Sequence, residues 1–448
     1  MIKKLALSAF ALVSSLGSPL LAQDSAAPQK AAVEFNPRGG LPNFLAKLKA
    51  GQPVKVGYLG GSITAQKGWR VKSLAWLQDR YPSAKLTEIN AAIGGTGSDL
   101  GVFRIERDVL QAKPDLLFVE FAVNDSKAPP ENIRKAMEGI VRKTWQALPD
   151  CDICFVYTVI ERDISDLQAG KMKTSESVME DIADFYKIPS VHFGLEIADL
   201  ARQGKLVMSS PDAHVERVSG DELNEIAQLP VDEQGRVLFS KDGVHPYLDT
   251  GHVLYMKALA RALEKLEGVG KAGPHEFKAP LHANNWEKAK FIPLDITPTE
   301  GLAEKLDPAS NSLARTFSGT LPVLWSLKPG AEIRLKFRGT KASLYQLMGP
   351  DCGSVEVVLD QGPARKFNLV DSYCSNHRLN VLPLGDNLAD GEHEVTVKVL
   401  DTPLDKAKIL SAQNAEDLTK NPAKYDGLNW YTGAIFLVGD LIDVQVAP

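Results

Sequence analysis

The segment VKVGYLGGSIT, residues 54–64, joins an apolar run to a polar turn. The run from Val54 to Leu59 is mostly apolar and lacks steady polar alternation, as expected of a strand that is covered on both faces of a parallel sheet. It ends at Gly60 and Gly61, and Ser62 follows at once. Open α/β sheets place their sites at the carboxyl edge, so this arrangement predicts that the Ser62 hydroxyl lies at that edge.

The same pattern continues to about residue 265, with short apolar runs separated by segments of helical periodicity. This alternation predicts an α/β fold with a three-layer parallel sheet whose strands are covered on both faces. The segment 195–235 breaks the rhythm and is long for a connection, which leaves open whether it walls a cleft or is a surface excursion. The further expected strands are 86–90, 116–121, 154–160 and 190–193, and the expected helices are 69–80, 100–111, 131–147, 175–187 and 252–265.

A second domain is predicted after about residue 290, where the periodicity changes. Prolines at 274, 280, 293 and 298 mark a boundary within residues 270–300. Beyond it, residues 332–337 and 394–399 alternate between apolar and polar side chains, and residues 354–360 and 434–438 add further apolar runs, as expected of a β-sandwich. We therefore expect a catalytic domain at 31–285 and a sandwich at 295–448, and we expect the first to act on small esters without the second.

The amino-terminal segment and the overall charge indicate where the protein acts and which partners it is expected to have. Lys3 and Lys4 precede an apolar stretch that is too short to span a bilayer, and Ala22 offers a cleavage site, so residues 1–22 are predicted to be a signal peptide. We expect a periplasmic or secreted protein with no membrane partner. The net charge of −5, dispersed along 448 residues, disfavours nucleic acid as a partner. The sequence leaves the oligomeric state open.

Four cysteines form two local pairs in the sequence, Cys151 with Cys154 and Cys352 with Cys374. The first pair enters an apolar strand instead of opening a helix, so a structural disulfide or buried thiols are favoured over a redox site. A zinc site is disfavoured because no cluster with ligand spacing lies nearby. The pairing stays open.

Three fragments besides Ser62 carry groups that a serine hydrolase needs. Asp242 and His245 stand three residues apart in one loop, a spacing that lets the carboxylate orient the imidazole. Asn124 follows the strand 116–121, where its amide can donate to an oxyanion or form an Asx turn. Gly95 lies in a glycine-rich loop that matches neither a P-loop nor a dinucleotide fingerprint. Each fragment alone is weak evidence, and their combination predicts nucleophilic catalysis.

The order of these blocks resembles the SGNH hydrolases, also called the GDSL esterase/lipase superfamily. The resemblance covers roughly residues 50–265 and implies a flavodoxin-like sheet and no cofactor. It implies that Ser62 is the nucleophile, His245 the base and Asp242 the residue that orients it. It also implies an oxyanion hole formed by the N–H groups of Ser62 and Gly95 and by the side chain of Asn124.

Two positions depart from the pattern of that superfamily. The usual Gly-Asp-Ser is here Gly60-Gly61-Ser62, and the usual Gly-x-Asn-Asp is Ala122-Val123-Asn124-Asp125. Neither change removes a catalytic group, but both leave open what replaces the missing contacts. Gly94 is an alternative to Gly95 as the backbone donor.

The predicted sandwich bears on the substrate. In the superfamily that this sequence resembles, some exported members carry an added β-sandwich, a jelly-roll domain that is similar to galactose-binding-like modules. Such members resemble carbohydrate esterases that remove acetyl groups from polysaccharides. We therefore expect an acetylated carbohydrate as substrate, with a lipase or thioesterase, or a noncatalytic glycan-binding protein, as alternatives. Trp430 and Tyr431 either stack on sugar rings or pack in the core. Trp69 and Arg70 either line the cleft or pack a helix on the sheet.

Overall fold

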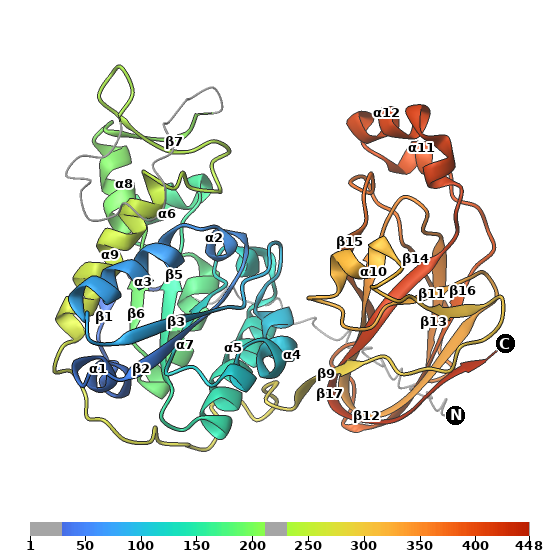
Figure 1. Cartoon of the computed structure of the whole chain (residues 1–448), viewed down its shortest axis with the longest axis horizontal. Coiled ribbons are helices and arrows are strands. Elements are labelled where there is room, and N and C mark those ends of the chain that lie inside the picture. Colours follow the sequence, from blue (N-terminus) through green and yellow to red (C-terminus); the bar gives the residue numbers. More distant parts are fainter. Residues whose placement is uncertain (1–28, 211–230, 448) are drawn as a thin grey trace, which may run out of the picture.

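The computed structural model describes residues 29–210 and 231–447, which form an N-terminal α/β unit and a C-terminal β unit (Figure 1). The predicted signal peptide, residues 1–22, lies outside this range. Within the range, no helix combines the length and the apolar character needed to cross a membrane.

A six-stranded sheet forms the centre of the N-terminal unit, with the strand order β1-β6-β5-β4-β2-β3. All neighbours pair in parallel except β1, which adds an antiparallel edge strand to β6. The order of the five parallel strands is that of a flavodoxin-like sheet, as the sequence predicted. The strands are β1 (Phe35–Asn36), β2 (Pro53–Gly60), β3 (Lys85–Asn90), β4 (Leu116–Glu120), β5 (Asp152–Tyr157) and β6 (Ser190–His192).

Helices cover both faces of this sheet, which makes the three layers expected from the sequence (Figure 1). Alternate residues of the buried strands enter different cores, so that Tyr58 packs on one face and Leu59 on the other. The first face carries α1 (Pro42–Lys49), α3 (Trp69–Arg80) and α9 (Gly251–Leu266), and the second carries α4 (Ser98–Asp108), α5 (Pro130–Ala147) and α7 (Thr174–Tyr186).

Two expectations about this unit were wrong in part. Strand β3 is not covered on both faces, because it is the edge of the sheet and most of its side chains are exposed or half-buried. The segment 195–235 is not irregular throughout. It begins with α8 (Leu195–Arg202) and β7 (Leu206–Ser209), and β7 pairs in parallel with β8 (Val237–Ser240). Residues 211–230 lie outside the described range.

The C-terminal unit is a nine-stranded antiparallel sheet that folds over into two layers, the β-sandwich expected from the sequence. Its two longest strands, β12 and β17, pair with each other along most of their length and belong to both layers. The first half of β12 pairs with β16 and the second half with β15. The strands are β9 (Ala289–Pro293), β10 (Ala303–Lys305), β11 (Trp325–Leu327), β12 (Glu332–Met348), β13 (Ser354–Leu359), β14 (Arg365–Asn368), β15 (Arg378–Gly385), β16 (Gly391–Val399) and β17 (Trp430–Ala447).

The bend of the two long strands depends on a pair of glycines. Gly339 of β12 faces Gly439 of β17 at a break in the register of the pair. A Cβ on Gly339 would lie 2.1 Å from the carbonyl oxygen of Val438, and a Cβ on Gly439 would lie 2.1 Å from that of Arg338. Only glycine permits this approach, so the sandwich turns over at this point.

The two units share one hydrophobic core. Phe103 of α4 stacks on Phe436 of β17, with ring centroids 4.9 Å apart and an angle of 7° between the rings. Trp286 packs beside Phe103 at 6.1 Å, and its backbone lies against Gly139 of α5. The Arg107 guanidinium lies 4.3 Å from the ring centre of Phe291 in β9. The N-terminal unit therefore buries one helical face against the sandwich, which changes our expectation that it acts without the second unit.

Two histidine–carboxylate pairs fix the segment that joins the units. His275 Nε2 lies 2.9 Å from Asp152 Oδ1, and His282 Nδ1 lies 2.8 Å from Glu138 Oε2. Both carboxylates are fully buried at positions in β5 and α5. The segment from α9 to β9 is therefore held across the base of the N-terminal unit and is not a free linker (Figure 1).

Candidate active site

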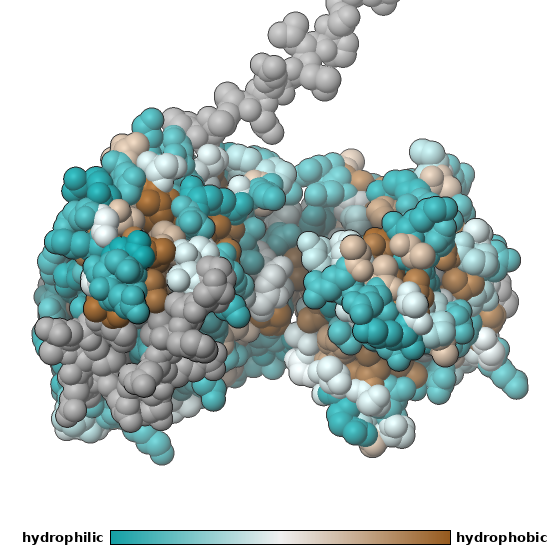
Figure 2. Space-filling model, turned by 90° about the horizontal axis from the view of Figure 1, so that it is seen from above, coloured by the Kyte–Doolittle hydropathy of each residue, from teal (hydrophilic) through white to brown (hydrophobic). Residues whose placement is uncertain are grey.

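The candidate site lies where the order of the parallel strands reverses, between β2 and β4. These strands are neighbours, with Gly60 paired to Glu120 at their carboxyl ends. Ser62 begins α2 (Ser62–Ala65) directly after β2, and Asn124 begins a short 3₁₀ helix (Asn124–Lys127) just after β4. Ligands of open α/β sheets bind in the crevice at such a switch point. Figure 2 looks onto this side of the molecule and shows a furrow between the two units.

The structure brings Ser62, His245 and Asp242 into one chain of hydrogen bonds. His245 Nε2 lies 2.9 Å from Ser62 Oγ, and His245 Nδ1 lies 2.8 Å from Asp242 Oδ2. The two bonds leave from opposite nitrogens of the imidazole, so a neutral ring that donates to Asp242 accepts from Ser62. This is the arrangement that lets a histidine take a proton from a serine hydroxyl.

The loop between β8 and α9 fixes Asp242 as well as His245. Asp242 Oδ1 accepts from the backbone N–H groups of Val244 at 2.9 Å and His245 at 2.8 Å, while Oδ2 faces the imidazole. Partial burial raises the pKa of Asp242, but the hydrogen bonds from the His245 ring and from these backbone groups outweigh it, and the pKa lies below its usual value of 3.8. Asp242 is therefore ionised when His245 works at neutral pH.

The backbone N–H groups of Ser62 and of one glycine in the loop 94–95 are candidate donors to an oxyanion. The Ser62 N–H lies in the first turn of α2, where backbone N–H groups have no acceptor within the helix. A Cβ built on Gly94 would lie 3.5 Å from Ser62 Cβ, whereas one built on Gly95 would meet nothing within 4 Å. Gly95 adopts a left-handed φ of +74°, so it provides the turn that brings Gly94 beside Ser62. Of the two glycines, Gly94 is the nearer to the nucleophile.

Asn124 explains why Gly61 replaces the aspartate of the usual Gly-Asp-Ser. A Cβ on Gly61 would lie 2.0 Å from Asn124 Oδ1, so the amide of Asn124 occupies the space that a side chain at position 61 would need. Within the described part of the chain, no hydrogen bond is formed by the Asn124 side chain, which leaves its N–H groups available to a ligand. Gly61 therefore permits the close approach of Asn124 to the nucleophile.

Residues 58–221 match the model of a protein family described as the GDSL-like lipase/acylhydrolase family. Within the N-terminal unit, this segment is similar to a GDSL-like hydrolase domain. This confirms the resemblance found in the sequence, and it covers the nucleophile, the glycine loop and Asn124. No curated protein matches the chain at a significant level.

Both units of the chain also resemble solved structures of a two-domain esterase. One structure is of a two-domain esterase (CEX) active on acetylated mannans, co-crystallized with mannopentaose; it is 20% identical with a TM-score of 0.64, over 92% of this chain and 97% of that chain. The other, of the same description without mannopentaose, is 20% identical with a TM-score of 0.63, over 89% and 94%. At this identity the likeness establishes the fold of both units in the same order.

Two contacts from α9 support the nucleophile side of the GDSL-like domain. The backbone N–H of Trp69 donates to His252 Nδ1 at 3.1 Å, and His252 Nε2 lies 3.2 Å from Gln66 Oε1. Burial lowers the pKa of His252 to about 3, so this ring is neutral at any working pH. The histidine therefore ties the segment after Ser62 to the helix that follows His245. No local feature of the sequence distinguishes His252 from a core residue, so its role could not be predicted.

Asp125 joins the Asn124 turn to the glycine loop. Its Oδ1 accepts from the backbone N–H of Ser98 at 3.0 Å, at the start of α4 directly after the loop. The other oxygen, Oδ2, is buried and has no hydrogen-bond partner. Burial raises the pKa of Asp125 from 3.8 to about 7, although hydrogen bonds from Ser98 oppose the rise. The carboxyl group therefore titrates near neutrality at a position between two proposed oxyanion donors.

We expect Asp125→Asn to stabilise the protein at pH 8 and to have little effect on stability at pH 4. The folded protein holds this proton up to about pH 7, whereas an unfolded aspartate releases it near 3.8. Asp125 therefore contributes stability that is fully present below pH 3.8 and is lost as the pH rises to about 7, with an upper bound of about 4 kcal/mol. Asparagine stays neutral throughout.

Urea unfolding of both proteins at pH 5, 6, 7 and 8 measures this effect. The exposed Asp401→Asn serves as the control and should follow the wild type at each pH. A constant difference between Asp125→Asn and wild type across the series would show that Asp125 is ionised throughout and that its pKa is not raised.

Four aromatic and cationic candidates for the cleft are core residues. Trp69 is fully buried, and Arg70, also buried, donates from Nε to the carbonyl of Thr64 at 3.0 Å. Trp430 is fully buried and donates to Gln346 Oε1 at 2.6 Å, and Tyr431 donates to Asp351 Oδ2 at 2.6 Å. The sugar-stacking alternative for Trp430 and Tyr431 was wrong, because both side chains are buried and hydrogen-bonded within the sandwich.

All four cysteines are buried and unpaired in the described structure. Burial raises the pKa of each thiol, to about 11 at Cys374, so none is a thiolate at neutral pH. Of the two alternatives left by the sequence, a structural disulfide or buried thiols, the structure has buried thiols.

Metal-ligating side chains gather at one place among residues 29–210 and 231–447, in the sandwich. Ligand atoms of Asp351, Cys352 and His377 lie within 4.8 Å of one another. The oxygens of Asp351 already accept from His377 at 2.7 Å, Tyr431 at 2.6 Å and Asn429 at 2.9 Å. We assign no metal to this group, and the chemistry at Ser62 needs none.

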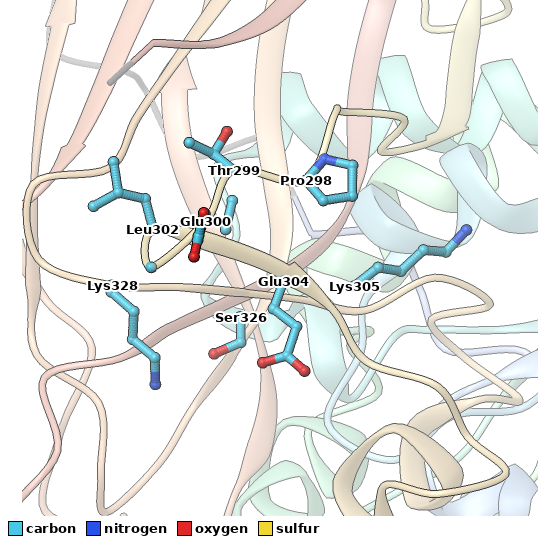
Figure 3. Close-up of a pocket in the computed structure, with 10 residues that line it drawn as sticks. Pro298, Thr299, Glu300, Leu302, Glu304, Lys305, Ser326 and Lys328 are labelled. Atoms are coloured by element: carbon cyan, nitrogen blue, oxygen red, sulfur yellow. The ribbon is translucent and has the colours of Figure 1, made fainter.

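A cavity of about 570 Å³ lies in the sandwich unit and is lined by residues 298–305, 326 and 328 (Figure 3). It is formed by β10, β11 and the turn before them, and its polar side chains include Glu304, Lys305 and Lys328. None of the catalytic candidates lines it. We therefore place the reaction at the edge of the α/β sheet and not in this cavity.

Proposed function

We propose that the protein is a serine esterase that removes O-acetyl groups from a poly- or oligosaccharide through an acyl-enzyme on Ser62. The observation that carries the proposal is the unbroken chain of hydrogen bonds from Ser62 Oγ through His245 to Asp242. The similarity in fold to a two-domain esterase described as active on acetylated mannans supports carbohydrate as the substrate class.

The geometry supports a two-step reaction. His245 Nε2 takes the proton of Ser62 Oγ as the oxygen attacks the acetyl carbonyl, and Asp242 stabilises the imidazolium. The oxyanion is held by the Ser62 N–H, a glycine-loop N–H and the Asn124 amide. His245 then gives its proton to the departing sugar oxygen. In the second step it activates a water, which releases acetate and restores Ser62.

An open catalytic edge supports a polymeric substrate. The side chains of His245 and Asp242 are 42% and 49% exposed, and Ser62 is half-buried. A hydroxyl at this depth is accessible to an acetyl group that projects from a chain too wide to enter a tunnel.

A lipase would need an apolar rim around the site, and among the described residues the segments that carry the catalytic candidates present no exposed large apolar side chain. The large apolar side chains exposed on the described residues are scattered over the molecule. None belongs to the segments 60–68, 92–98, 122–128 or 241–248, which carry the catalytic candidates. These side chains are Val33, Val231, Phe277, Leu281, Tyr373 and Ile442.

Acetate release from a panel of substrates tests the proposal. Acetylated mannan, acetylated xylan and an acetylated pectin are compared with a long-chain acyl ester, each with wild type and with Ser62→Ala as the blank. We expect Ser62-dependent acetate release from at least one polysaccharide and none from the long-chain ester. Binding to a polysaccharide without acetate release would support the noncatalytic alternative, and preference for the long-chain ester would support the lipase.

We also propose that the protein acts in the periplasm or outside the cell. Residues 1–22 support this, since they combine two lysines, a short apolar stretch and a small residue before Gln23. Amino-terminal sequencing of the exported protein tests it. A mature chain that begins near residue 23 is expected, and an uncut chain in the cytoplasm would contradict it.

A further inference from the structure

A buried carboxylate, that of Glu120, lies next to the turn that carries Ser62. Glu120 is the last residue of β4 and is 1% exposed, although the rest of the strand is apolar. Burying an acidic group costs more free energy than burying an apolar or amide side chain of similar size. A carboxylate in such a strand therefore indicates a purpose other than stability.

The contacts of Glu120 bracket Ser62 along the chain. Its Oε2 accepts from the hydroxyl of Thr64 at 2.8 Å, two residues after the nucleophile. Burial raises the pKa of Glu120, and the backbone N–H of Gly61, the residue just before the nucleophile, is among the groups that oppose the rise. The short helix that begins at Ser62 is therefore tied by the Thr64 side chain to the end of a rigid strand.

Further contacts complete the clamp on this turn. Glu120 Oε1 accepts from the hydroxyl of Thr158 at 2.8 Å, which lies just beyond β5 and outside the turn that carries Ser62. Arg70 Nε donates to the carbonyl of Thr64 from the other side. Gly60 is packed so closely that a Cβ would lie 2.8 Å from the Glu120 carbonyl oxygen. Glu120 therefore binds the side-chain hydroxyl of Thr64 in α2, and Arg70 binds the backbone carbonyl of the same residue.

We propose that Glu120 is a positioning residue for the nucleophile, which sets the direction of Ser62 Oγ and of the Ser62 N–H by holding the short helix α2 at Thr64. This inference rests on the proposed esterase function. Glu120 acts through hydrogen bonds and does not touch the substrate. A small misplacement of a reacting group costs on the order of 10²-fold in rate, which gives such a clamp a kinetic role.

Two threonines that donate to the same carboxylate provide the test. Thr64→Val removes the contact between Glu120 and the nucleophile helix, and Thr158→Val removes an equally short contact that does not touch that helix. Both residues are fully buried, and both changes are close to isosteric. We expect similar falls in melting temperature, so a difference in activity reports on positioning.

Turnover of para-nitrophenyl acetate gives the readout. We expect Thr64→Val to lower kcat by about fivefold or more with KM little changed, Thr158→Val to lower it by less than about twofold, and Thr64→Ser, which keeps the hydroxyl, to restore most of kcat. Equal kcat values for the two valine variants, or a Thr64→Val enzyme as fast as wild type, would overturn the proposal.

Substitutions of Glu120 itself separate its charge from its hydrogen bonds. Glutamine can accept from one threonine and donate to the other, so Glu120→Gln should keep more of kcat than Glu120→Ala. Glu120→Ala retaining the higher kcat would also overturn the proposal. If Glu120→Ala does not fold, the threonine pair decides alone. Wild type no faster than Ser62→Ala on this ester would contradict the proposed function, whereas active wild type with equal variants contradicts only the role of Glu120.

Discussion

Ser62→Ala is expected to lower acetate release by a factor on the order of 10⁴ to 10⁶ while the protein stays folded. The change removes the atom that attacks, and the rest of the site cannot supply another nucleophile in its place. Ser62 is half-buried at the start of a four-residue helix, so the loss of one oxygen leaves packing unchanged. The rate of acetate release at saturating substrate measures the loss of activity, and the melting temperature of the variant shows whether it stays folded.

Asp242→Asn is the matched comparison for this variant. The carboxylate only orients His245 and stabilises its charged form, and it is half exposed, so solvent replaces part of its effect. We expect a loss smaller than that of Ser62→Ala, on the order of 10² to 10⁴. Acetate release by Ser62→Ala at the wild-type rate would exclude the mechanism, whichever way Asp242→Asn behaves.

Removing the sandwich is the second change with a large expected effect. A chain that ends after Glu287 loses β9 and β17, which cover Phe103 of α4. We expect this fragment to aggregate or to bind a hydrophobic dye, because a large apolar helical face becomes exposed to water. Its turnover of para-nitrophenyl acetate should fall more than about tenfold, since α4 follows the glycine loop directly.

Phe103→Ala tests the same interface without shortening the chain. The loss of a buried aromatic ring costs about 3–5 kcal/mol, and the stacked pair with Phe436 is part of that cost. If the shared core couples the units, unfolding followed by enzyme activity and by the fluorescence of the sandwich tryptophans should occur at one lowered temperature. A soluble fragment with the wild-type melting temperature and turnover would contradict the coupling.

Much of the α/β unit could be predicted from local patterns. The helix expected at 69–80 is α3, residue for residue, and the run before Ser62 is β2 within one residue at each end. The continuous apolar runs of buried parallel strands and the period of amphipathic helices are both local features of the sequence. The exposed faces of β3 could not be predicted, because its place at the sheet edge depends on strand order.

The catalytic set could be proposed from the sequence, but its supports could not. Ser62, Asn124 and the Asp242–His245 pair each end or follow an apolar run, and this gave a signal. Glu120 is also conspicuous in the sequence, since it is the single charged residue in an apolar strand. Its contact with Thr64 could not be predicted, because that contact depends on the pairing of β2 with β4, which are distant in sequence. The need for glycine at position 61 could not be predicted, because it depends on the Asn124 amide, which occupies the space of a side chain at that position.

Contacts between the units were the least predictable feature. Phe103 and Phe436 are separated by most of the chain, and each fits the period of its own helix or strand without reference to the other. The change of sequence pattern that predicts two domains carries no information on how much apolar surface the two domains share. Trp430 illustrates the same point, because a tryptophan before the last strand is equally compatible with a surface site and with the core.

Mass spectrometry of the enzyme quenched in acid during turnover tests the central claim most directly. Wild type is mixed with an acetylated oligosaccharide that it deacetylates, stopped within the first turnovers and digested. The account predicts one acetyl group on the peptide that contains Ser62, which is absent from Ser62→Ala. Acetate release without an acetyl group on that peptide, or an acetyl group on another residue that forms and decays with turnover, would contradict it.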